Sequence, residues 1–189
     1  MSYAFLSVAP DVVARSPMER SARAAGARFE ARDGWNVAVE YPQGDHSVTW
    51  ADASHLGKLE LHGSHGLPLG TARREVDAWV CPVTRDRALV IGDIRGRDGV
   101  DVTSGWAALR IQGPLARELF ARFCALDLRP HVTPPGAFRP GSVARTPGMV
   151  LCEDTDTYLA LVGAAVGEHL WTVVEDAGRH LGGGPIPYA

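Results

Sequence analysis

The stretch "WADASHLGKLELHGSHG" at residues 50–66 holds the only lysine of the chain, Lys58, and three of its seven histidines. Residues 58–62 alternate between leucine and polar side chains, which predicts a half-buried strand. An extended chain rises about 3.3 Å per residue, so His55 lies roughly 23 Å from His62, too far apart to share one metal ion. The remaining pair of histidines makes only a weak site. The sequence therefore predicts no metal site here.

Catalytic motifs are equally sparse in this stretch. Asp52, Ser54 and His55 are the residue types of a hydrolase triad, but a triad is a spatial arrangement usually drawn from distant segments. The sequence "HGSHG" also lacks the spacing of the G-x-S-x-G nucleophile elbow. Neither a G-x-G-x-x-G nor a G-x-x-x-x-G-K segment occurs, so no nucleotide fingerprint is present. We assign no catalytic residue from the sequence.

Composition limits the class of protein. A chain of 189 residues with 46% hydrophobic and 22% charged residues is typical of one globular domain. Its net charge of −3 gives no electrostatic reason to expect nucleic acid or an anionic membrane as a partner. No apolar run approaches a membrane span, and the N-terminus lacks the basic region of a secretory signal. Three widely spaced cysteines argue against disulfides. We expect a cytoplasmic protein.

Hydrophobic spacing predicts the elements around this stretch. They are, in chain order, a helix capped by Ser16 and ended by Gly34, strands at 36–41, 58–62, 77–83, 87–93 and 105–113, a helix from Pro114, a hairpin at 148–154 and 157–163, and a helix at 166–181. Residues 129–142 are too rich in proline and glycine for regular structure. Because helices do not alternate with strands, we predict an α+β fold with mixed, largely antiparallel sheets and three main helices.

Several segments follow an order that is typical of one known superfamily. Residues 16–41 and "DASHLGK" after them are similar to an opening helix, a "GGW" turn, a strand and a "D-x-SH-x-GK" segment. "IQGPLA" at 111–116 is similar to a "QGP-x-A" turn, and "LWTVVEDAG" at 170–178 to an "LW" helix. Together they resemble the glycine cleavage T-protein (aminomethyltransferase) family. Residues 124–146 more closely resemble the gamma subunit of heterotetrameric sarcosine oxidases, in the same superfamily.

The resemblance to T-proteins implies their folate-binding fold and tetrahydrofolate chemistry, with two departures. The family's paired-Asp segment is replaced here by "CPVTRDRALVIGD", in which Asp93 is the nearest acid. Its "RTGYTGE" segment is reduced to "RTPGMVL", which keeps Arg145 and Thr146 but loses the tyrosine and the glutamate. T-proteins are also about twice as long. A folate-dependent aminomethyl- or methyltransferase therefore remains one alternative, and a fold repurposed for another small molecule remains another.

The resemblance to gamma subunits implies a chain that is not catalytic alone. Its partners would be larger subunits that carry flavin and NAD and oxidise an amine such as sarcosine. Trp50, Trp79 and Trp106 would then be either interface residues or core residues, and the sequence leaves both open. If this chain contacts a ligand such as tetrahydrofolate, the resemblance favours four residues, namely Asp93, Arg145, His55 and Lys58.

Domain organisation follows from the same segments. We expect residues 1–189 to form a single T-protein-like domain, with a division into two lobes near 94–104 or 130–142 as the alternative.

Overall fold

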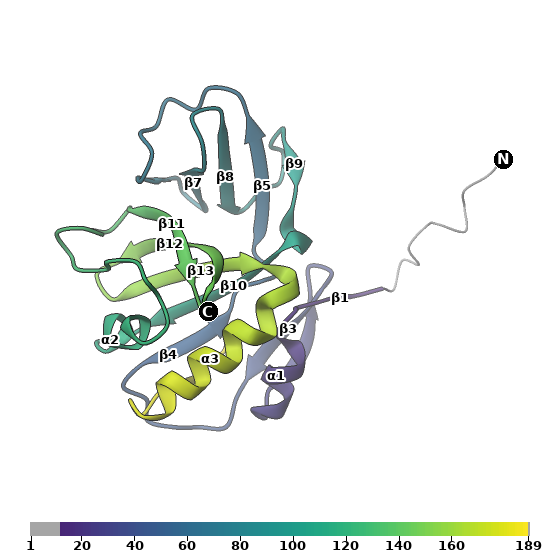
Figure 1. Ribbon diagram of the computed structural model, residues 1–189. Coiled ribbons are helices and arrows are strands. Elements are labelled where there is room, and N and C mark those ends of the chain that lie inside the picture. The colour runs from purple at the N-terminus through teal and green to yellow at the C-terminus, as the bar shows by residue number, and fades with distance from the viewer. Residues whose placement is uncertain (1–11, 189) are drawn as a thin grey trace.

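The computed structural model describes residues 12–188, which form three sheets and three α-helices (Figure 1). Most strand pairs are antiparallel, and the parallel pairs among these residues are β1 with β3 and β14 with β4. The predicted α+β class, with mixed and largely antiparallel sheets and three helices, is confirmed. None of the helices in the described part of the chain is long and apolar enough to cross a membrane.

A six-stranded sheet forms the centre of the molecule. Its strands, in spatial order, are β11 (Phe138–Val143), β12 (Thr146–Asp154), β13 (Thr157–Gly163), β10 (Trp106–Gln112), β4 (Thr49–Asp52) and β14 (Gly184–Pro185). Both of its faces are buried, so its strands are nearly continuous apolar runs. On β10, Leu109 faces a core that is closed by the helices, whereas Ala108 faces a second core on the other side.

The three helices cover one face of this sheet. They are α1 (Glu19–Ala24), α2 (Ala116–Ala121) and α3 (Gly167–Arg179). Leu119, Leu170 and Trp171 from these helices pack in one cluster with Trp50 of β4. Trp50 and Trp171 meet edge to face, with ring centroids 6.4 Å apart. Trp50 is therefore a core residue, which decides one of the three tryptophans that the sequence left open.

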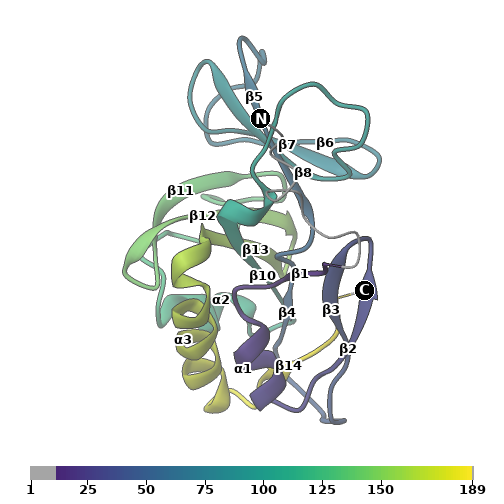
Figure 2. The same ribbon diagram turned by 90° about the vertical axis from the view of Figure 1, so that its right-hand side faces the viewer.

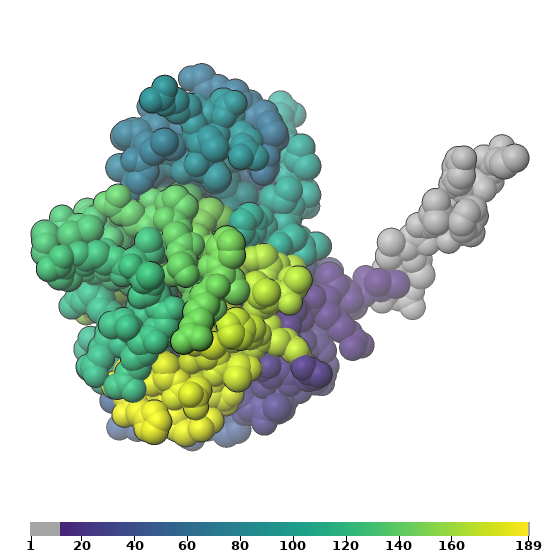
Figure 3. Space-filling view, viewed as in Figure 1, coloured from purple at the N-terminus to yellow at the C-terminus, as the bar shows by residue number. Residues whose placement is uncertain are grey.

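A five-stranded sheet covers the opposite face and projects from the molecule in the space-filling view (Figure 3). Its order is β6 (Arg73–Arg74), β7 (Ala78–Pro82), β8 (Arg87–Gly92), β5 (Gly57–His62) and β9 (Val100–Asp101). Its inner face places Cys81, Leu89 and Ile91 against the central sheet. The chain enters this sheet after β4 and leaves it across residues 102–105. The expected single domain, and the alternative of two lobes divided near 94–104 or 130–142, both stay predictions.

A three-stranded sheet lies beside α1 (Figure 2). One of its strands takes up the second half of the first predicted helix, so that part of the prediction was wrong. The sheet contains β1 (Ala14–Arg15), β3 (Trp35–Glu40) and β2 (Arg28–Arg32). The helix ends at Ala24 because the chain turns at Gly26, whose φ is +86°, and residues 28–32 then pair with β3. Asp33 and Gly34 both have positive φ, as a two-residue hairpin turn requires. The Asp33-Gly34 pair is a typical hairpin-turn sequence, and the prediction missed it because the apolar residues before it follow helical spacing.

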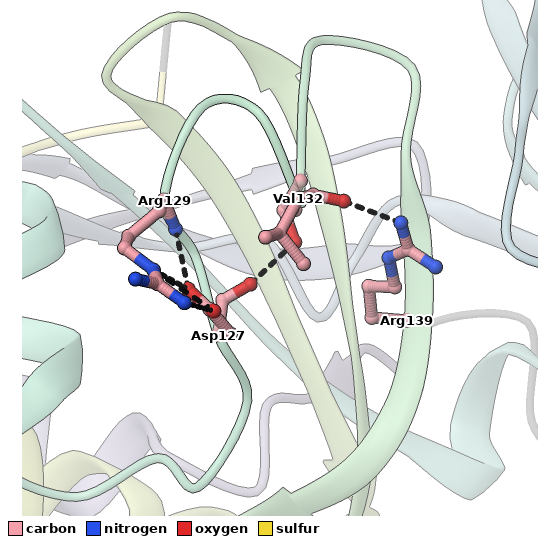
Figure 4. Close-up of polar contacts among 5 residues, drawn as sticks. Asp127, Arg129, Val132 and Arg139 are labelled. Carbon is pink, nitrogen blue, oxygen red and sulfur yellow. Dashed lines mark hydrogen bonds and ion pairs between the residues drawn. The ribbon is translucent and has the colours of Figure 1, made fainter.

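The segment predicted to be irregular, 129–142, is only partly so. Its first part is a loop braced by polar contacts: Arg129 pairs with Asp127, Thr133 Oγ1 donates to the Asp127 carbonyl, and Arg139 donates to the Val132 carbonyl (Figure 4). Its second part belongs to β11, although that strand contains Pro140. Pro140 is tolerated because β11 is the edge strand of its sheet. A proline there can face away from the neighbouring strand, so its missing N–H costs no hydrogen bond between strands.

Gly178 tests the packing between α3 and the central sheet. A Cβ at this position would lie 2.7 Å from the ring of Trp50, which is fully buried and cannot move aside. Helix propensity alone predicts that Gly178→Ala stabilises the protein. We expect instead that it lowers the free energy of unfolding by about 1–3 kcal/mol, as overpacked cores do. Urea unfolding measures this. Thr172→Ala, on the exposed side of α3, is the control and should change stability by less than about 0.5 kcal/mol. A more stable Gly178→Ala protein would contradict the packing described here.

Candidate functional site

Lys58 lies at the junction between the central sheet and the five-stranded sheet, and its side chain is completely buried. Its Nζ donates hydrogen bonds to the carbonyls of Ser54, at 2.8 Å, and Ala53, at 3.2 Å. The alternation in residues 58–62 predicted Lys58 on the polar face of its strand, and that prediction was wrong. The segment after β9 covers this side chain: the Val102 N–H donates to the Lys58 carbonyl.

The other residues of the "DASHLGK" segment close the same junction. Asp52 Oδ1 accepts the Ser54 N–H at 2.9 Å, which folds the chain back after β4. Ser54 Oγ accepts the Ala108 N–H at 3.1 Å and so ties the turn to β10. The Lys58 N–H donates to Thr103 Oγ1 at 3.0 Å. The spacing of this motif therefore satisfies buried backbone groups where two sheets meet.

Burial determines the ionisation of this junction. Loss of solvation lowers the pKa of Lys58 to about 7, although the carboxylates of Asp52 and Asp101 favour its charged form. Burial also lowers the pKa of His55, and the nearby Asp52 opposes that shift. Near neutral pH the structure therefore holds a partly neutral amine that has no open path to solvent. Such a group stabilises a turn but has no access to a substrate.

A cleft of about 720 Å³ opens in front of this junction. It is bounded by the β2–β3 hairpin, the start of β5 and the end of β8, and Trp35, His55 and Asp93 lie in its wall. The chain's last described residue, Tyr188, also lines it, because the Ile186 N–H donates to the Trp50 carbonyl and fixes the tail. Tyr188 packs edge to face on His55, with ring centroids 5.1 Å apart.

Three of the four predicted site residues therefore meet at this place, and the fourth does not. His55 and Asp93 line the cleft, and Lys58 lies buried behind it. Arg145 lies in the turn between β11 and β12, where it lines a different cavity. We predicted neither Tyr188 nor Arg110, whose guanidinium lies 4.3 Å from the Tyr188 ring centroid. Nothing in the sequence around Tyr188 indicates that this tail residue packs against the cleft.

Asp93 is not available as a ligand contact in this structure. Both of its carboxylate oxygens accept hydrogen bonds from the Arg95 guanidinium, at 2.9 and 2.8 Å, and Oδ1 also accepts the Arg95 N–H. These bonds hold the pKa of Asp93 well below its usual range. A pterin needs a carboxylate that is free to accept its edge N–H groups. A ligand at Asp93 would therefore have to displace the Arg95 guanidinium, and the role of Asp93 stays a prediction.

The position that corresponds to the family's lost glutamate is apolar and closed. Counting along "RTPGMVL" from Arg145 places Leu151 where the "RTGYTGE" segment has its glutamate. Leu151 is fully buried between the two large sheets, together with Phe138, Leu89 and Leu161. A carboxylate there would be buried without a partner, which costs several kcal/mol. The residues present do not fit a folate at this place, and no chemical step is derived through one.

The histidines of the opening stretch have separate surroundings. His55 contacts Tyr188, the exposed His62 pairs with Glu60 at 2.9 Å, and His65 Nε2 lies 2.7 Å from the Thr84 carbonyl. Within residues 12–188, no three His, Cys, Asp or Glu side chains gather in a way that could hold a metal ion. The three cysteines carry no disulfide.

Two solved structures share this fold. A chain of heterotetrameric sarcosine oxidase from Corynebacterium sp. U-96, in complex with pyrrole 2-carboxylate, matches with a TM-score of 0.70 at 18% identity over 89% of this chain and 96% of that chain. The glycine cleavage system aminomethyltransferase T from Bartonella henselae matches with a TM-score of 0.71 at 13% identity over 93% of this chain. This chain spans only 60% of that aminomethyltransferase.

Sequence comparison adds no relative, because no family model and no curated protein sequence matches the chain. The resemblance inferred from the motifs is nevertheless confirmed for the fold, since the solved neighbours are a sarcosine oxidase chain and a T-protein. The chain has the T-protein-like fold.

The buried amine makes a testable contribution to stability. The amine of the unfolded chain loses its proton at the ordinary lysine pKa of 10.5, whereas the pKa of Lys58 in the folded chain is about 7. Between these values the unfolded state holds more protons, so this group makes the free energy of unfolding rise with pH, by at most about 1.4 kcal/mol per pH unit. Lys58→Met should remove that rise, as measured by denaturant unfolding of both proteins from pH 7 upward. The single lysine also gives one Cε resonance whose NMR titration reports its pKa directly. Parallel stability profiles for the two proteins would contradict this account.

Proposed function

We propose that the chain is a non-catalytic, gamma-type subunit of a hetero-oligomeric flavoenzyme that resembles sarcosine oxidase and acts in amine or one-carbon catabolism. The observation that carries this proposal is one of length. The match takes in 96% of a sarcosine oxidase chain but only 60% of the aminomethyltransferase. The aligned region thus contains nearly all of that sarcosine oxidase chain, which supports a similar structural role for this fold here. Flavin and NAD would then lie on the larger partner chains, in the cytoplasm.

The two positions that the resemblance marks for an acid support the proposal, because neither offers a free carboxylate. Leu151 and its apolar neighbours fill the space between the sheets, and Arg95 occupies the carboxylate of Asp93. These two features remove the acids at the two positions that the family resemblance singles out. What remains is a stable three-layer scaffold, and such a scaffold can contribute an interaction surface without chemistry of its own.

Exposed apolar side chains indicate where a partner would bind. Among the described residues, three of the large hydrophobic side chains that face solvent lie in the part of the chain that forms the five-stranded sheet: Val76, which is 93% exposed, Val100 and Leu69. This sheet projects from the rest of the molecule (Figure 3). Leu69 and Val76 flank β6 at one edge of the sheet, and Val100 lies in β9 at the other edge. We assign the partner contact to the β6 edge, because burial of exposed apolar surface drives association.

A second candidate is a stand-alone folate-dependent transferase, favoured by the cleft in front of the junction. Its volume of about 720 Å³ is sufficient for a drug-sized ligand, and Trp35 and Tyr188 supply aromatic walls. Asp33 and Asp101 also line it, and Asp101 Oδ1 accepts hydrogen bonds from the N–H and the hydroxyl of Thr103. Saturable binding of tetrahydrofolate to the purified chain would favour this candidate over the structural subunit.

Affinity purification from the native host tests the proposal. The tagged full chain should recover larger chains in fixed proportion, with the visible absorbance of bound flavin. Val76→Glu and Leu69→Glu should reduce this recovery at least about tenfold, because each places an unpaired charge in a desolvated interface. Thr172→Glu, on the opposite layer, is the matched control and should leave recovery unchanged. All variants should unfold within about 0.5 kcal/mol of the wild type, since these side chains are exposed.

The opposite result is equally clear. A monomeric chain that recovers no flavoprotein, together with saturable tetrahydrofolate binding, would overturn the subunit proposal.

A further inference from the structure

A second cavity, of about 490 Å³, lies on the helical side of the molecule, away from the cleft. Three segments of the chain form it: the end of α2 with the residues after it, the turn between β11 and β12, and the first two turns of α3. The side chains that matter for its chemistry are Arg122, Phe123, Arg145, His169 and Val173. The resemblance names Arg145 as a candidate ligand contact, but neither it nor the proposed function gives the cavity as a whole a role.

Basic groups surround the cavity, and no carboxylate lines it. Arg122 contacts Glu118 only at 3.6 Å. Arg145 has no ion pair with any carboxylate in the described residues, in contrast to Arg95 and Arg110, which each hold a carboxylate through two nitrogens. Arg145 therefore places at the rim a positive charge that no carboxylate of residues 12–188 pairs with, although the chain as a whole has a net charge of −3.

The backbone that presents Arg145 is held in an unfavourable conformation. Ala144 and Arg145 have φ of 51° and 61°, in a region that costs non-glycine residues of order 1 kcal/mol or more each. Two-residue hairpin turns of this kind prefer Asn-Gly, so the conformation is imposed by the surroundings. The Ala144 N–H donates to the Phe123 carbonyl at 2.9 Å, and His169 Nε2 lies 2.9 Å from the Ala144 carbonyl. Residues of the cavity itself thus fix the turn.

The floor of the cavity is apolar, with the half-buried side chains of Phe123 and Val173. An apolar floor with a few convergent polar groups at the rim is the usual composition of a small-molecule site. We propose that this cavity binds a small carboxylic acid with a compact apolar body, whose carboxylate is held by the Arg145 guanidinium beside Arg122 and His169. Guanidinium grips a carboxylate through two parallel N–H···O bonds, which an unpaired arginine is free to form.

Benzoate and its neutral isostere benzamide test the site, with the full-length chain in low salt. Benzoate should cause saturable NMR shifts of the Arg145 side-chain N–H and of the Ala144 and His169 amides, whereas benzamide should not. Arg145→Gln should weaken benzoate binding at least about tenfold, because it removes a charge-assisted bidentate contact. Arg145→Lys, which keeps the charge but not the fork, should bind with intermediate affinity. Arg85→Gln, at an exposed arginine outside the cavity, should bind as the wild type does.

Three outcomes would overturn the proposal: equal shifts from benzamide, equal affinity in Arg145→Gln and wild type, or shifts that do not saturate. Thermal unfolding of each variant checks that the turn is intact, and Arg145→Lys keeps the test valid if Arg145→Gln unfolds. The outcome is independent of whether the chain is a subunit, because the cavity and the exposed side of the five-stranded sheet share no residue.

Discussion

The buried amine of Lys58 is the interaction on which the relation between the two large sheets depends. It satisfies the carbonyls of Ala53 and Ser54 at the point where the chain leaves β4 for β5. Without the amine, the buried Ser54 carbonyl would have no donor, at about 1–3 kcal/mol, whereas the Ala53 carbonyl would still accept the Leu56 N–H. A shorter donor on β5 would not reach across the turn, and an arginine would add three nitrogens to satisfy. Lysine combines the length with a single amine that can lose its charge when it is buried.

The second constraint is that the central sheet is covered on both faces. Its strands carry apolar side chains toward the helices and toward the five-stranded sheet, and the exception on its central strands is the half-buried Arg110–Glu153 ion pair. A sheet of this kind has no surface to spare for a ligand unless an apolar layer is opened. Here Leu151 and Phe138 keep that layer closed. The accessible sites are consequently at the margins, where loops, the C-terminal tail and helix ends meet.

Regular periodicity made much of the fold predictable from the sequence. The strands at β3, β5, β7, β8, β10, β12 and β13 and the helix α3 follow from apolar runs, alternation and helical spacing. The failures came where local chemistry competes with spacing. Phe29 falls at helical spacing but lies in a strand, because Gly26 and the Asp33-Gly34 turn redirect the chain. Pro140 suggested a loop but lies at a sheet edge, and edge position is a tertiary property that no single segment reveals.

The candidate site shows the same limit in a sharper form. The motif correctly placed Lys58 and His55 close together. The alternation along β5, however, predicted a solvent-exposed Lys58, because alternation within one strand gives no information on the later segment 102–105, which packs beside Lys58. The resemblance indicated Asp93 as the carboxylate nearest to the expected position, but this carboxylate accepts hydrogen bonds from Arg95, only two residues away. Local pairing of this kind depends on backbone geometry rather than on residue type. At 13–18% identity the chain shares the fold of its structural neighbours, and the motif residues described here act on the backbone: Asp52, Ser54 and Lys58 satisfy N–H and carbonyl groups where two sheets meet.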